Sequence, residues 1–250
     1  MGLRIFAHAA ALVFRYFASA LSISAVLYLV PTVLYQFALA TMITKNPDPL
    51  TAMRVAGPIL GLLSAAAALW IAVGWHRYIL LDEMPGTIVP PFRGDRILAY
   101  FGNTLLVGLI AGAVGLVVFV PLVFIAAGIA RGGGAVSYLL ILVSLVGYFF
   151  AAVLVYRVSL ILPASAIGKP ITISESWAAT RGSGGTIFVL AFVSVFCALV
   201  LTLPVLWIRP NLGALAGFVW QTVTGWIELM VAVSIITTLY GHYVEKRPLP

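Results

Sequence analysis

Six long apolar segments make up most of the chain, and they decide what it can fold into. They cover residues 17–43, 55–81, 97–127, 136–162, 186–208 and 213–240. An α-helix rises about 1.5 Å per residue and the hydrocarbon core of a bilayer is about 30 Å thick, so each segment is long enough to span a membrane. The sequence therefore predicts an all-α, polytopic membrane bundle of six transmembrane helices.

The composition leaves no room for a separate soluble domain. Of the 250 residues, 63% are hydrophobic and only 8% are charged, whereas soluble proteins contain about 25% charged residues. No polar segment is long enough to build a soluble core. We therefore interpret residues 1–250 as one integral membrane domain, with the helical bundle at 17–240 and a short tail at 241–250. The first apolar segment is about twice as long as a signal-peptide core, which favours an uncleaved transmembrane helix.

Residues 1–16 form a segment that is too short and too charged to cross a bilayer. On a helix, Arg4, His8 and Arg15 share one face, while Phe6 and Val13 occupy another. We expect an amphipathic helix that lies on the membrane surface before the chain enters the bilayer.

The distribution of Lys and Arg predicts how the helices are oriented. Ten of the 14 basic side chains fall in the terminal segments and in the loops after the second and fourth apolar segments, all on one side of the predicted membrane. The positive-inside rule makes this the cytoplasmic side, so both termini are expected there. The net charge of +7 is spread over short loops with no basic face. That pattern argues against nucleic acid as a partner and favours anionic lipid headgroups.

Short sequence matches indicate an internal repeat. Residues 15–18 and 99–102 both place Tyr before Phe at the start of an apolar segment, and 76–80 and 156–160 both place Arg second and Leu last at the end of one. Repeats of this kind mark structural units that recur along a chain. We expect three related helical hairpins, each preceded by a short helix on the cytoplasmic side.

Glu228 is the acidic residue that lies deepest in an apolar segment. It is roughly 24 Å along the helix from one end of the run 212–240 and roughly 18 Å from the other. A carboxylate at that depth costs several kcal/mol unless it is protonated, paired or facing a polar cavity. Gln221, Thr224 and Glu228 recur at steps of three and four, so they share one helix face. We predict that these three residues form an intramembrane polar site facing the interior of the bundle.

Five residues near the expected cytoplasmic helix ends are candidates for contact with lipid headgroups. Two interpretations stay open. Basic and aromatic side chains commonly reach the interface without forming a site, or the basic residues line a shallow pocket for a lipid phosphate. The five residues are His76, Arg77, Arg157, Trp177 and Arg181.

Three pairs of glycines spaced four residues apart predict faces where helices approach closely. Packing between helices of this chain is the expected use, and contact with a second copy or a partner membrane protein is the alternative. The pairs are Gly57 and Gly61, Gly108 and Gly112, and Gly213 and Gly217.

The segment between the fourth and fifth apolar segments carries local helix signals and a resemblance. Thr172 and Glu175 have the spacing of a capping box, and Gly182 can end the short helix in the left-handed conformation. Residues 160–164 (Leu-Ile-Leu-Pro-Ala) and 176–182 (Ser-Trp-Ala-Ala-Thr-Arg-Gly), after an arginine near a helix end, resemble a family of six-helix bacterial inner-membrane proteins. The family includes the membrane domain of glycerophosphoryl diester phosphodiesterases and its stand-alone relatives.

The resemblance covers the connection between the fourth and fifth helices and the six-helix topology. It implies a bacterial inner-membrane protein of the envelope, without an established chemistry. The resemblance does not carry a phosphodiesterase activity over to this chain, because the sequence contains no attached catalytic domain of that kind.

Motifs for catalysis, cofactors or metals are missing from the sequence. There is no GxSxG, HExxH or Walker loop, and Cys197 is the single cysteine, so we expect neither a cofactor nor a bound metal. We expect a non-enzymatic accessory, assembly or regulatory factor that packs against a partner protein or lipid. The alternative is a small transporter that uses Glu228 as a proton- or cation-linked carboxylate, and an enzyme acting on a lipid headgroup is a third possibility.

Overall fold

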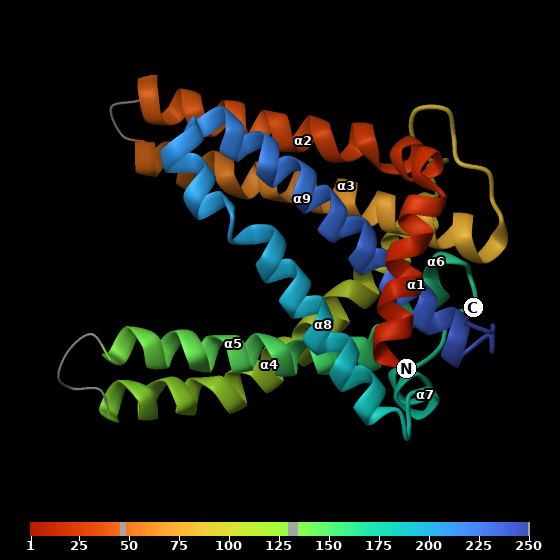
Figure 1. Cartoon of the computed structure of the whole chain (residues 1–250). Helices are drawn as coiled ribbons and strands as arrows, with labels where there is room; N and C mark the ends of the chain where they lie inside the picture. The colour runs from red at the N-terminus through yellow and green to blue at the C-terminus, as the bar shows by residue number, and fades with distance from the viewer. Residues whose placement is uncertain (46–48, 130–134, 250) are drawn as a thin grey trace.

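The computed structural model describes residues 1–45, 49–129 and 135–249, and within these ranges the secondary structure is entirely helical (Figure 1). The long helices alternate in direction, so both termini lie at one end of the molecule, together with three short helices. We refer to this as the terminal end. The helices are α1 (Gly2–Arg15), α2 (Phe17–Lys45), α3 (Pro49–Leu81), α4 (Gly94–Ile129), α5 (Ala135–Val158), α6 (Ile161–Ala166), α7 (Ile173–Ala179), α8 (Gly184–Thr202) and α9 (Val205–Tyr243).

Four helical stretches of the described chain are long and apolar enough to cross a membrane. They are Phe17–Ala38, Ala56–Leu81, Gly94–Val117 and Gly184–Tyr243, the last of which contains both α8 and α9. In α5 the apolar part is shorter, Leu142–Val158. Large apolar side chains on these helices point outward, among them Leu62 and Leu109, which are 72% and 71% exposed. An apolar outer surface of this kind is what lipid contact requires, so the protein is a helical membrane protein in its general class.

The long helices pack in two close pairs and one divergent pair. Helix α2 packs along α3, and α4 packs along α5. Helices α8 and α9 instead separate, because α8 runs diagonally across the molecule to pack on α1 and α5, while α9 packs on α1 and α3 (Figure 1). The three expected hairpins therefore differ in how their two helices contact each other.

Helix α1 is built into the bundle. The sequence correctly predicted an amphipathic helix, but its Ile5, Ala9 and Val13 are fully buried against α8 and α9. Gly2 permits this close approach, since a Cβ at that position would collide with the backbone of Thr186 in α8. One face of α1 therefore packs on protein, and its position on the membrane surface stays a prediction.

Two predicted helix ends also differ from the structure. The fourth segment ends at Val158, and the following α6 is a separate short helix whose six residues are all buried. The fifth segment ends at Thr202, where Pro204 cannot donate the hydrogen bond that would continue the helix. Helix α4 contains Pro121 and extends past it to Ile129.

Candidate functional site

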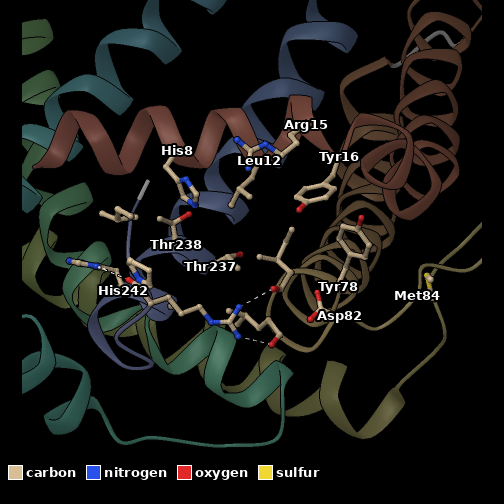
Figure 2. Close-up of a pocket in the computed structure, with 16 residues that line it drawn as sticks. His8, Leu12, Arg15, Tyr16, Tyr78, Asp82, Met84, Thr237, Thr238 and His242 are labelled. Carbon is tan, nitrogen blue, oxygen red and sulfur yellow. Dashed lines mark hydrogen bonds between the residues drawn. The ribbon is translucent and has the colours of Figure 1, made fainter.

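A cavity of about 500 Å³ opens at the terminal end, between α1, the end of α3 and the end of α9. Figure 2 shows His8 and Arg15 on α1 along one wall, with Thr237 and Thr238 of α9 facing them. Asp82 is the only acidic residue among the described residues that line it. We call this the terminal cavity; the residues that matter for its chemistry are His8, Arg15, Tyr78, Asp82, Thr238 and His242.

Thr238 is the buried polar group of this cavity that lacks a partner. Its side chain is 6% exposed, and its hydroxyl makes no hydrogen bond within the described chain. Buried hydroxyls are almost always hydrogen-bonded, so the Thr238 hydroxyl can bond to a polar group that enters the cavity. His8 lies beside it in Figure 2. Burial, together with the positive charge of Arg15, lowers the pKa of His8 below 6.5, so its ring is neutral at pH 7 and can both donate and accept.

Two basic residues of the cavity differ in how strongly they are engaged. Arg247, in the tail, donates hydrogen bonds to the carbonyls of Leu80 (2.8 Å) and Ile79 (3.3 Å) at the end of α3, and it pairs with Glu245. It therefore fastens the tail to the bundle. Arg15 makes no hydrogen bond or ion pair with residues 1–45, 49–129 or 135–249, so its charge is available to a ligand.

His76 lies directly behind this wall and is completely buried. Its Nδ1 is 2.8 Å from the Thr237 hydroxyl of α9, and its Nε2 is 3.2 Å from the Tyr100 hydroxyl of α4. The Thr237 hydroxyl already donates to the carbonyl of Val233, so Nδ1–H must donate to Thr237, and Nε2 accepts from Tyr100. The imidazole joins three helices. The prediction of a headgroup-facing His76 is wrong, because α4 and α9 cover the end of α3.

Arg77 is also occupied by protein contacts. Its Nε donates to Glu83 at 2.6 Å, and its Nη1 donates to the carbonyl of Ala166 in α6 at 3.0 Å. Arg93 binds the other oxygen of Glu83 at 2.9 Å. Partial burial raises the pKa of Glu83, but the two guanidinium groups outweigh this and hold it below 4.5. Arg77 therefore closes the turn after α3 and has little charge left for a lipid.

The other three headgroup candidates lie around α7. The Thr172–Glu175 capping box is present, and Gly182 adopts φ +79°, as predicted from the sequence. The Arg157 guanidinium lies over the Trp177 ring, 4.9 Å from its centroid. Both residues line an apolar cavity of about 330 Å³ between α4, α5 and α7, while Arg181 is exposed. None of the five candidates lines the terminal cavity: His76 and Arg77 lie near the end of α3, and the other three lie around α7.

The face of α9 that carries Gln221, Thr224 and Glu228 contacts α8 and the first part of α9 itself. Glu228 accepts a hydrogen bond from Thr202 at 3.1 Å, and Gln221 accepts one from Arg209 at 3.1 Å. Thr224 donates to the carbonyl of Trp220 at 2.8 Å, within its own helix. The three residues share one face as expected, but each has a separate partner.

Glu228 also lines a second cavity, of about 430 Å³, between α1, α5, α8 and α9. It is the only charged residue among the described residues of that lining, and the rest is mostly apolar. We call this the Glu228 cavity; its principal residues are Phe6, Phe14, Tyr156, Phe196, Cys197 and Glu228.

The glycine pairs do not mediate packing between the described helices. A Cβ at Gly57, Gly61, Gly108 or Gly112 would have no described atom within 4 Å. Gly213 instead has φ +89° and breaks α9, and a Cβ on Gly217 would collide with the Arg209 side chain, which belongs to the first part of the same helix. The expectation of close packing within this chain is therefore wrong for the described residues, and the two pairs on α3 and α4 face outward.

Sequence reasoning missed Thr238, His8 and Arg15 as parts of one site. The available signals were His8 and His242, on segments far apart in the chain, and two adjacent threonines near the end of an apolar run. In the described part of the chain, no group of three His, Cys, Asp or Glu residues could hold a metal ion. Comparison with protein-family models, curated proteins and solved structures finds no match. The resemblance noted for residues 160–182 therefore stays a prediction.

Proposed function

We propose that this chain is a non-enzymatic accessory protein of the bacterial inner membrane that holds an anionic lipid headgroup in the terminal cavity. The observation that carries the proposal is the buried hydroxyl of Thr238, which has no hydrogen-bond partner in the described chain and lies beside His8. Arg15, whose guanidinium makes no ion pair in the described chain, lines the same cavity. A phosphate group needs both hydrogen-bond donors and positive charge, and these side chains supply them. The cavity is at the helix ends, where headgroups lie in a bilayer.

Six spans with cytoplasmic termini form part of the same proposal. Helix α5 has 24 residues and α8 has 19, which correspond to about 36 Å and about 29 Å of helix. Both lengths approach or exceed the thickness of the hydrocarbon core. The excess of Lys and Arg at the terminal end favours the cytoplasm for that side. Whether the hairpins descend from one repeat stays a prediction.

The test measures how much phosphatidylglycerol and phosphatidylcholine the purified full chain binds. Native mass spectrometry detects the bound lipid. We expect the wild-type protein to retain more phosphatidylglycerol than phosphatidylcholine. The mass of the bound lipid should be unchanged, because the protein does not hydrolyse it. Arg15→Gln and Thr238→Val should each lower its occupancy at least fivefold. Arg181→Gln is the matched control, because it removes one exposed charge at the same end but outside the cavity. Equal retention by all four proteins would refute the headgroup site, and hydrolysed lipid would refute the non-enzymatic role.

A second candidate function is transport, and a specific observation favours it. Glu228 faces a cavity and has no cationic partner in the described chain. Carboxylates within membrane segments commonly couple to protons or cations. Transport would require Glu228→Gln to abolish uptake while the protein remains folded.

A further inference from the structure

The Glu228 cavity combines one carboxylate with a large apolar wall. Four helices contribute to it, and aromatic rings come from three of them: Phe6 and Phe14 of α1, Tyr156 of α5 and Phe196 of α8. Its volume of about 430 Å³ is within the usual range for small-molecule sites, about 300 to 1,000 Å³. From this lining we infer that the cavity binds an amphipathic organic cation, whose charge is delocalised or shielded by apolar groups.

Electrostatics select the sign of the ligand charge. Glu228 receives one hydrogen bond, from Thr202 to Oε1, and no Lys, Arg or His lines the described wall. The attraction between opposite charges is several times stronger in such surroundings than in water. A cation is therefore favoured and an anion is repelled.

The apolar wall selects the type of cation. A strongly hydrated ion would lose its water shell here and gain only one carboxylate in return. A cation shielded by apolar groups loses much less hydration and gains contact with the phenyl rings. Aromatic faces also attract cations directly, by about 0.5 to 2 kcal/mol for each good contact.

The rim of the cavity indicates the route of entry. Phe14, Phe196 and Val200 line the cavity and are more than half exposed. These exposed apolar side chains place the opening on the flank of the bundle, which is the surface that would face lipid. An amphipathic cation, which partitions into membranes, could therefore enter from the side.

This inference deepens the transport candidate and is independent of the headgroup site, because the two cavities share no lining residue. We would test it by equilibrium binding of tetraphenylphosphonium to the full chain in detergent. Tetraphenylborate has the same shape and the opposite charge, so it reports apolar partition alone. We expect tetraphenylphosphonium to bind at least tenfold more tightly than tetraphenylborate.

Variants separate the carboxylate from the apolar wall. Glu228→Gln should weaken tetraphenylphosphonium binding at least tenfold and leave tetraphenylborate unchanged or tighter. Ala232 lines the cavity at its exposed rim, so Ala232→Phe should fill the cavity and weaken binding while the carboxylate is kept. This variant keeps the test decisive if Glu228→Gln does not fold. Asp95→Asn, which removes an exposed acidic group outside the cavity, is the control that should bind as the wild type does.

Cys197 reports the location of binding, because it is the only cysteine in the chain and lines this cavity. Saturating tetraphenylphosphonium should slow its reaction with N-ethylmaleimide in the wild type and in Arg15→Gln, but not in Glu228→Gln. Wild-type affinity in Glu228→Gln, or equal affinity for both probes, would overturn the cation site. An unchanged labelling rate at full occupancy would overturn its location. Neither result would affect the lipid measurements on Arg15 and Thr238.

Discussion

His76 shows how one buried polar residue can hold several helices of a membrane bundle together. Its two ring nitrogens are both used, one toward Thr237 and one toward Tyr100. If His76 becomes Phe, the Tyr100 hydroxyl loses its partner in a site that water does not reach. If Tyr100 also becomes Phe, no unpaired hydroxyl remains beside position 76. Tyr100→Phe should therefore lower the free energy of unfolding less in the His76→Phe background than in the wild type.

We therefore predict a positive coupling between these residues in a double-mutant cycle. His76→Phe should lower the free energy of unfolding by about 1 to 3 kcal/mol. The coupling with Tyr100→Phe should be about 0.6 to 2 kcal/mol, the range for hydrogen bonds within membrane proteins. Unfolding in mixed detergent micelles, followed by circular dichroism, measures both. Strict additivity would mean that the hydrogen bond between His76 and Tyr100 contributes nothing.

At the scale of elements, Gly213 shows that a pair of glycines spaced four residues apart can have either of two structural roles. A glycine four residues from another can let helices approach, or it can adopt a backbone conformation that other residues avoid. Gly213 does the second, with φ +89° and ψ 170°, a region occupied almost only by glycine. Gly108 has an open helical position, where a Cβ would have no described neighbour within 4 Å.

The prediction is that alanine has opposite effects at these two positions. Gly213→Ala should destabilise the protein by about 1 to 3 kcal/mol, because it strains the break in α9. Gly108→Ala should be neutral in detergent or stabilising by up to about 1 kcal/mol, since alanine favours a helix interior. Thermal melting of the purified variants measures this. Destabilisation of Gly108→Ala only where the protein is oligomeric would support the alternative of contact with a second copy.

The elements were largely predictable because their signal is local. The described part of each apolar segment is largely helical, although two segments are interrupted, and the Thr172–Glu175 cap and the left-handed Gly182 follow from short spacings. The errors concern tertiary context. The sequence of α6 is indistinguishable from the end of a transmembrane segment, since its residues are compatible with both a buried short helix and a membrane-spanning one. His76 reads as an interfacial residue, because its burial depends on α4 and α9. The terminal cavity joins α1 to α9, and no local pattern links Arg15 to Thr238.

Across the whole molecule, charge and apolar surface are segregated along the helix axes. The ion pairs found in the described ranges, Arg77 and Arg93 with Glu83, Asp95 with Arg96, and Glu245 with Arg247, all belong to the terminal end. The long helices that extend from it expose leucine, valine and phenylalanine. From this arrangement we expect the membrane plane to cross the long helices, with the terminal end in contact with one aqueous phase.

Six crossings and four crossings make different predictions for the loops. With six, the exposed residues Thr87, Ser174 and Lys246 lie on one side of the membrane, and the exposed Asn211 between α8 and the main part of α9 lies on the other. Single cysteines at these positions, in a Cys197→Ala background, can be labelled with an impermeant maleimide. We expect labelling at the first three only in inside-out vesicles, and at Asn211 only in right-side-out vesicles. Labelling of the Ser174 position from the side of Asn211 would mean that α4 and α5 do not both cross. Because the terminal cavity lies on the same side as Thr87 and Lys246, the same experiment decides which leaflet supplies its headgroup.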